Sequence, residues 1–228
     1  MEQERALVRS KLTPPPAAAI AGILFSLLLI ASLVLIRLSV PEDPQDAGEW
    51  LAGGWRNVSL ALNLLPFAGI AFLWFIGVVR DRLGENEDRL FATVFLGSGL
   101  LFLAMLFASA AVAAGIMRMY AATPGMLTES GVYSFGRTVT YEIMNVYTMK
   151  MAGVFMITTS TLSLRTGIIP RWMAYLGLAL ALFLLFSLGF FDWAPLVFPL
   201  WILLISGHIL LANLRRPQSA NTTATPKG

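Results

Sequence analysis

The residues best suited to chemistry in this chain lie on one apolar stretch, from about 139 to 163. Lys150 falls near its middle, and Glu142, Asn145 and Tyr147 precede it. A lysine at the centre of a membrane helix costs about 2.5–3.5 kcal/mol. Ionisable residues inside a membrane therefore often mark a substrate or ion pathway, and we interpret these four residues as a candidate pathway.

The same residues could also serve packing alone. Glu142 and Asn145 share a helix face, but Lys150 lies about 12 Å from Glu142 along a helix and about 80° around it. An ion pair within the helix is therefore excluded, and no other apolar stretch carries a central carboxylate. Lys150 would await an anionic ligand, be neutral, or bond to Asn63, Tyr147 or backbone carbonyls.

Ser98 and His208 form a second candidate pair, because they lie at similar depths in two other apolar stretches. Such a pair superficially resembles the dyad of the rhomboid proteases, but Leu96 stands where the first glycine of that motif belongs. Small residues on the helix of Ser98 favour close packing instead; they are Gly97, Ala104, Ala108, Ala111 and Gly115. We assign no catalytic residue and keep His208 as an alternative proton relay, because imidazole titrates near neutral pH.

Asn63 and Pro66 lie one turn apart on another apolar stretch and together predict a kink. A proline ring displaces the carbonyl four residues back, which here belongs to Leu62. The kink could provide a hinge or a cavity wall, and a static bend explains it equally well. Asn63 therefore joins the candidate pathway residues.

Composition indicates that lipid surrounds these stretches. Hydrophobic residues make up 57% of the 228 and charged residues 13%, against about 25% charged in soluble domains. Crossing the hydrocarbon core takes about 20 apolar residues. Six stretches meet this requirement: 17–38, 57–79, 90–118, 139–163, 172–191 and 194–213.

The predicted fold class is therefore all-α, a polytopic transmembrane bundle of six helices over residues 17–213. Lysine and arginine are strongly biased between its two sides, with eleven in the tails and even-numbered loops and four on the other side. The positive-inside rule places the richer side in the cytoplasm. Both termini are then cytoplasmic, with an N-terminal tail at 1–16 and a disordered, polar tail at 214–228.

Several function classes are excluded by what the sequence lacks. The chain has no cysteine and a single histidine, so thiolate sites and histidine-rich metal centres are excluded. No nucleotide-binding loop is recognisable, and no cofactor or metal site is predicted. The basic residues lie in short loops beside apolar stretches, where they set orientation, so no nucleic acid partner is expected.

Three segments resemble a family of uncharacterised bacterial six-helix membrane proteins. They are Ala21-Gly22-Ile-Leu-Phe, the run from Arg80 to Phe102, and Ile169-Pro-Arg-Trp-Met-Ala-Tyr-Leu-Gly177. The resemblance implies the same architecture and a multi-pass location in the bacterial cytoplasmic membrane. It carries over no site residue.

Two function classes remain from the sequence. The first is a small-solute or ion transporter in which the 139–163 helix lines the path. The second is a non-catalytic membrane protein that acts through helix or loop contacts with a protein partner or a second copy of itself. Enzymatic activity is the least supported, because no set of nucleophile, base and orienting group converges.

Overall fold

The computed structural model describes residues 16–41, 50–83, 89–123, 131–167, 169–186 and 193–214. These residues are almost entirely helical and contain no strand, so the all-α prediction is confirmed for them. The predicted tails at 1–16 and 214–228 lie almost wholly outside the described residues. The elements are α2 (Pro16–Ser39), α3 (Leu51–Leu83), α4 (Arg89–Ala122), α6 (Val132–Glu142), the π-helical η1 (Ile143–Thr148), α7 (Met149–Thr166), α8 (Arg171–Phe186), the short 3-10 helix η2 (Ala194–Leu196) and α9 (Val197–Leu214).

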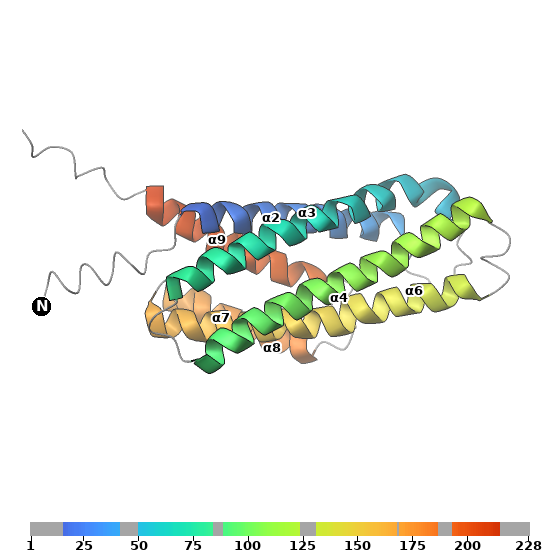
Figure 1. The fold of residues 1–228 in the computed structure, drawn as a ribbon. Coiled ribbons are helices and arrows are strands. Elements are labelled where there is room, and N and C mark those ends of the chain that lie inside the picture. The colour runs from blue at the N-terminus through green and yellow to red at the C-terminus, as the bar shows by residue number, and fades with distance from the viewer. Residues whose placement is uncertain are drawn as a thin grey trace, which may run out of the picture.

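The long helices run along a common direction and form an elongated bundle (Figure 1). At one end, which we call the terminal end, α2 begins and α9 finishes. At the opposite end, which we call the cavity end, α2 finishes, α3 begins, α4 finishes and α6 begins. The most extensive helix pairings are α2 with α3 and with α9, and α7 with α8 and with α4.

Among the residues that the structure describes, four helical segments are long and apolar enough to cross a membrane. They are Ala17–Ser39, Gly53–Arg80, Leu90–Ala122 and Ala194–Leu214, and α8 is a shorter apolar helix. The helical run of α6, η1 and α7 is not among the four, in keeping with its many polar residues. All six predicted stretches coincide with helices over their described parts, and the structure identifies four of them as candidate membrane spans.

The helix predicted to begin at about 139 begins instead at Val132. Gly131 precedes it with a φ of 71°, a left-handed backbone that glycine adopts without steric cost. Gly136 is buried and packs directly on Ile116 of α4. Gly131 therefore permits the left-handed residue that precedes the helix, and Gly136 permits its early turns to approach α4 closely. At the other end, Gly167 finishes α7 with a φ of 68°.

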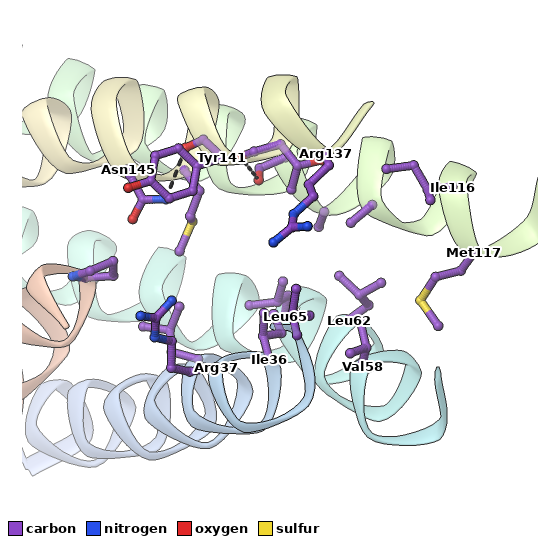
Figure 2. A pocket seen from close by; sticks show the side chains of 18 of the residues that line it. Ile36, Arg37, Val58, Leu62, Leu65, Ile116, Met117, Arg137, Tyr141 and Asn145 are labelled. Carbon is purple, nitrogen blue, oxygen red and sulfur yellow. Dashed lines mark hydrogen bonds between the residues drawn. The ribbon is translucent and has the colours of Figure 1, made fainter. Parts of the chain in front are cut away.

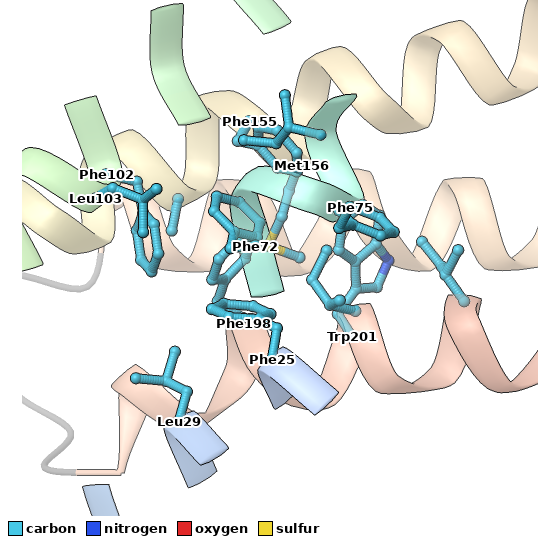
Figure 3. Packing of buried hydrophobic residues seen from close by; sticks show 14 of the residues in the cluster. Phe25, Leu29, Phe72, Phe75, Phe102, Leu103, Phe155, Met156, Phe198 and Trp201 are labelled. Atoms are coloured by element: carbon cyan, nitrogen blue, oxygen red, sulfur yellow. The ribbon is translucent and has the colours of Figure 1, made fainter. Parts of the chain in front are cut away.

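Phenylalanine rings from five helices meet at the centre of the bundle (Figure 3). The five rings, each at most 1% exposed, are Phe25 of α2, Phe72 of α3, Phe102 of α4, Phe155 of α7 and Phe198 of α9. Phe72 lies closest to the middle, with ring centroids 4.5 Å from Phe25 and 5.2 Å from Phe155. Aromatic pairs at such separations add to simple burial, so this five-ring cluster ties most of the helices together.

The small-residue stripe predicted on α4 is not a packing surface within the chain. Ala104, Ala111 and Gly115 are exposed, because α4 instead turns Phe95, Phe102 and other large residues inward. Close helix approach occurs at glycines outside this stripe: a Cβ at Gly22 would overlap Ser206, and one at Gly177 would overlap Ser160 and Trp201.

Pro66 does not interrupt α3, which continues as one helix from Leu51 to Leu83. Asn63 donates its side-chain N–H to the carbonyl of Ser59, at 2.9 Å, within the same helix. The Asn63 side chain is exposed, and its amide hydrogen bond stays within its own helix.

Candidate functional site

A cavity of about 500 Å³ lies at the cavity end of the bundle. Its walls come from the final turns of α2, the first half of α3, the second half of α4, α6 with η1, and η2 with the residues next to it (Figure 2). Ligand pockets commonly measure about 300–1,000 Å³, so the space suits a small molecule. Most lining side chains are apolar, among them Leu62, Leu65, Ile116 and Met144.

The five-ring cluster lies on the terminal-end side of the cavity on every helix that contributes to both. On α2 the lining begins at Leu33 and the ring is Phe25; on α3 the lining reaches Leu65 and the ring is Phe72. The helix α4 repeats this order, with lining from Leu106 onward and its ring at Phe102, whereas α7 and α9 contribute rings and no lining residue. The phenylalanines therefore separate the cavity from the terminal half of the bundle.

Two arginines project into the cavity from opposite walls, Arg37 from α2 and Arg137 from α6 (Figure 2). Arg137 Nη2 donates a hydrogen bond to the carbonyl oxygen of Pro41, at 2.6 Å. Its Nη1 is buried and has no hydrogen-bond partner among the described residues. No aspartate or glutamate occurs among the lining residues that the structure describes, so none of them neutralises the charge of Arg137.

The neutral polar groups of the wall bond within the protein. Ser109 donates to the carbonyl of Thr140 at 3.0 Å, and Thr140 donates to that of Gly136 at 2.8 Å. Asn145 Nδ2 donates to the carbonyl of Tyr141, at 3.1 Å. Several neutral donors therefore already bond to backbone carbonyls. The guanidinium of Arg137 has five N–H groups and can still donate further hydrogen bonds.

Trp50 and Tyr133 join two walls near the start of α3 and α6. Trp50 Nε1 donates to the hydroxyl oxygen of Tyr133, at 2.7 Å, and both residues line the cavity. Leu51 and Tyr133 form a small hydrophobic cluster apart from the main core. This link keeps α6 beside α3 at the cavity end, where the five-ring cluster does not reach.

A π-helical turn lies along the same wall, over Ile143–Thr148. Thr148 is fully buried and its hydroxyl donates to the carbonyl of Ile143, five residues back, at 2.7 Å. The wider turn places Met144 and Asn145 on the cavity. Single π-helical turns are uncommon and frequently lie at functional sites, so this turn supports the cavity as the candidate site.

The structure does not bring the six predicted pathway residues together. Asn145 lines the cavity, whereas the other five do not. Glu142 and Tyr147 are exposed on the same helical run, and His208 is partly buried on α9. Lys150 is partly buried and makes no hydrogen bond or ion pair with another described residue.

The polar side chains beyond Lys150 are mostly satisfied within α7. Thr158, Thr159 and Ser163 are buried and donate to carbonyls four residues back, at 2.7–2.9 Å. Bonds of this kind hide a hydroxyl inside a helix without a ligand. These three hydroxyls therefore serve packing, whereas the buried hydroxyl of Ser160 has no hydrogen-bond partner among the described residues.

Ser98, one member of the predicted alternative pair with His208, bonds within its own helix. The hydroxyl of Ser98 donates to the carbonyls of Val94 and Phe95, at 2.7 and 3.2 Å, within α4. No three histidine, cysteine, aspartate or glutamate residues lie close enough to hold a metal ion among the residues described.

Arg37 and Arg137 are the site residues that the sequence did not single out. Their positions beside apolar stretches suggested a role in orientation only, since basic residues flank membrane helices generally. A signal was nevertheless present, because both arginines fall on the arginine-poor side of the predicted topology. Their convergence depends on the packing of α6 against α4, which residue spacing along the chain does not determine.

Comparison with profiles of known protein families, with curated protein sequences and with solved structures gives no match. The class of the protein is therefore defined by its own features. Its described residues form a helical bundle with four helices suited to a membrane and a cavity of ligand size that contains arginine.

Proposed function

We propose that the chain is a six-span protein of the bacterial cytoplasmic membrane, with both termini cytoplasmic, and that it binds and transports a small solute through the cavity. Four spans are the long apolar helices; the others are α8 and the run from Val132 to Thr166. α8 covers about 24 Å at 1.5 Å per residue, which a bilayer can accommodate by local thinning. An even number of spans agrees with α2 beginning and α9 finishing at the same end (Figure 1).

The observation that carries the solute-binding proposal is the cavity itself. In a bundle that serves packing alone, side chains fill the interior to high density, as the five-ring cluster does here. The cavity end departs from this rule over about 500 Å³ and places polar side chains of the 132–166 run on the wall. The distribution of basic residues assigns this end to the extracytoplasmic side, so a solute would enter from outside.

Cysteine labelling tests this proposal directly, because the chain has no cysteine of its own. We expect Ala113→Cys, on the cavity wall, to react with a membrane-impermeant maleimide in intact cells. Ser219→Cys, in the C-terminal tail, should react only after the membrane is permeabilised. Ala152→Cys, which is fully buried, provides the matched unreactive control.

Two results of this labelling would contradict the proposal. If Ala113→Cys reacted no faster than Ala152→Cys, the cavity would not admit solutes. If Ser219→Cys reacted in intact cells, the C-terminus would not be cytoplasmic and the number or direction of the spans would have to change.

The second candidate function is contact with a protein partner without transport. The five-ring cluster favours it, because these rings close the bundle between the cavity and the terminal end. A transporter must open this barrier in its cycle, so Ser160→Cys, now fully buried, should react from the cytoplasmic side in part of the population. If it stays unreactive from both sides while Ala113→Cys reacts, binding without transport is the better description.

A further inference from the structure

We infer that the solute bound in this cavity is an amphipathic anion, with a carboxylate or phosphate head that binds Arg137 and an apolar body that lies against the cavity wall. The inference rests on the proposed function, since it names the chemical class of the solute for the same cavity. It is drawn from three features of the site: its charge, its unused hydrogen-bonding capacity and its apolar lining.

The charge of the lining selects against cations. Arg137 lines the cavity, and the described lining residues include no carboxylate to balance it. A guanidinium remains charged at any physiological pH. A cationic solute would therefore approach the like charge of Arg137, whereas an anion would be attracted by it.

The unused hydrogen-bonding capacity calls for an acceptor. Arg137 makes one hydrogen bond among the described residues, from Nη2 to the carbonyl of Pro41, and its Nη1 is buried without a partner. A buried donor without a partner costs about 1–3 kcal/mol, and more when it is charged. A small rotation of the guanidinium toward the cavity would let an anionic head pair with Nη1 and remove this cost.

The rest of the lining selects for an apolar body. The same space is lined by apolar side chains, among them Leu33, Ile36, Leu62, Leu65 and Ile116. The five-ring cluster closes it on the side of the terminal end. Neutral polar groups such as Ser109 and Asn145 are bonded to backbone carbonyls, so a sugar or another highly hydroxylated solute would find few partners. Carboxylates and phosphates match the planar fork of arginine, and an alkyl chain matches the remaining wall.

Two sources could supply this chemistry: a free single-chain acid and the head group of an anionic phospholipid. The experiment measures radiolabelled decanoate bound to the full chain in phosphatidylcholine nanodiscs, with empty nanodiscs subtracted. Decanol, which has the same chain without the charge, serves as the competitor. We expect saturable decanoate binding for which decanol competes about tenfold more weakly or worse.

Variants at two arginines then locate the head group. Arg137→Gln should weaken decanoate binding about tenfold or more. Arg137→Lys keeps the charge but loses the planar guanidinium, so its affinity for decanoate should lie between those of the unmodified chain and Arg137→Gln. Arg118→Gln is the matched control, because Arg118 is exposed on α4 and does not line the cavity. The comparison of decanoate with decanol on the unmodified chain needs no variant and stands even if Arg137→Gln fails to fold.

Nanodiscs that contain phosphatidylglycerol distinguish the two sources. If the phospholipid head occupies the site, decanoate binding weakens in these discs for the unmodified chain and not for Arg137→Gln. If decanoate binds equally in both kinds of disc, the solute is a free amphipathic acid.

The inference is overturned if decanol competes as well as decanoate, if Arg137→Gln binds decanoate normally, or if no saturable binding occurs. Each of these outcomes is separable from failure of the proposed function. Reaction of Ala113→Cys with the maleimide would still show that the cavity admits solutes, and only their charge would then be reassigned.

Discussion

Replacement of Phe72 by alanine should be the most damaging single truncation in the bundle. Its ring lies within 4.5–6.2 Å, centroid to centroid, of Phe25, Phe75, Phe102, Phe155 and Phe198, and it has no exposed surface. In soluble proteins, truncation of a buried phenylalanine to alanine costs about 3–5 kcal/mol. Between membrane helices the transfer from water contributes little and packing dominates, so we expect a loss near the lower limit, about 3 kcal/mol.

The measurement is the free energy of unfolding of the purified protein in mixed micelles titrated with a denaturing detergent. Phe67→Ala is the matched control, because Phe67 lies on the same helix with 62% of its surface exposed. We expect a change of about 0.5 kcal/mol or less for this control. Equal losses for the two variants would show that the five-ring cluster does not hold the helices together.

The same substitution also bears on function. Because the five-ring cluster separates the cavity from the terminal half of the bundle, its loss at Phe72 would open space at the cavity floor. Phe72 therefore both holds the helices together and closes the cavity toward the terminal half of the bundle.

Much of the helical architecture could be predicted from the sequence. Crossing a bilayer imposes a minimum length of apolar residues, and this constraint acts locally, so the six stretches coincide with helices in their described parts. The stretch predicted to begin at 172 corresponds to α8, which begins at Arg171. The start of α6 at Val132 was missed, because Tyr133, Ser134 and Arg137 make this part too polar to resemble a membrane helix.

The candidate site was much harder to predict. Lys150 drew attention because a charge in an apolar stretch is costly, yet that cost says nothing about which way the side chain points. Arg137 lies closer to the end of its helix and looked ordinary, but α6 packs on α4 and turns this arginine toward Arg37 of α2 (Figure 2). Sites that draw side chains from helices far apart in the sequence depend on tertiary packing, and no local pattern encodes that packing.

The stripe of small residues on α4 also shows that a local sequence pattern does not determine tertiary packing. Small residues permit close approach between helices, but they do not require it, and on α4 several of them are exposed. Gly177 of α8, one of the glycines at which the bundle is tightest, lies outside this stripe. It is buried against α7 and α9, where a Cβ would meet Ser160 and would approach Trp201 Nε1 and Cε2 at 2.7 and 2.8 Å.

Gly177→Val should therefore destabilise the protein by about 3 kcal/mol or prevent its folding. Overpacking of a well-packed core typically costs about 1–3 kcal/mol, and here relief is restricted on both sides. Trp201 is 1% exposed and Ser160 is fully buried, so neither side chain can move into open space. The alternative is separation of α8 from α7 and α9, which would break a helix pairing among the most extensive in the bundle.

Gly97→Val provides the matched control for this prediction, measured by the same detergent titration. Gly97 is also helical, and a Cβ placed there has no neighbour within 4 Å. Both variants carry the same gain in helix propensity over glycine, a few tenths of a kcal/mol, so their difference isolates the steric contribution. If Gly177→Val were as stable as Gly97→Val, α8 would be free to shift relative to its neighbours, and the α7–α8–α9 contact would be a loose joint that could move during transport.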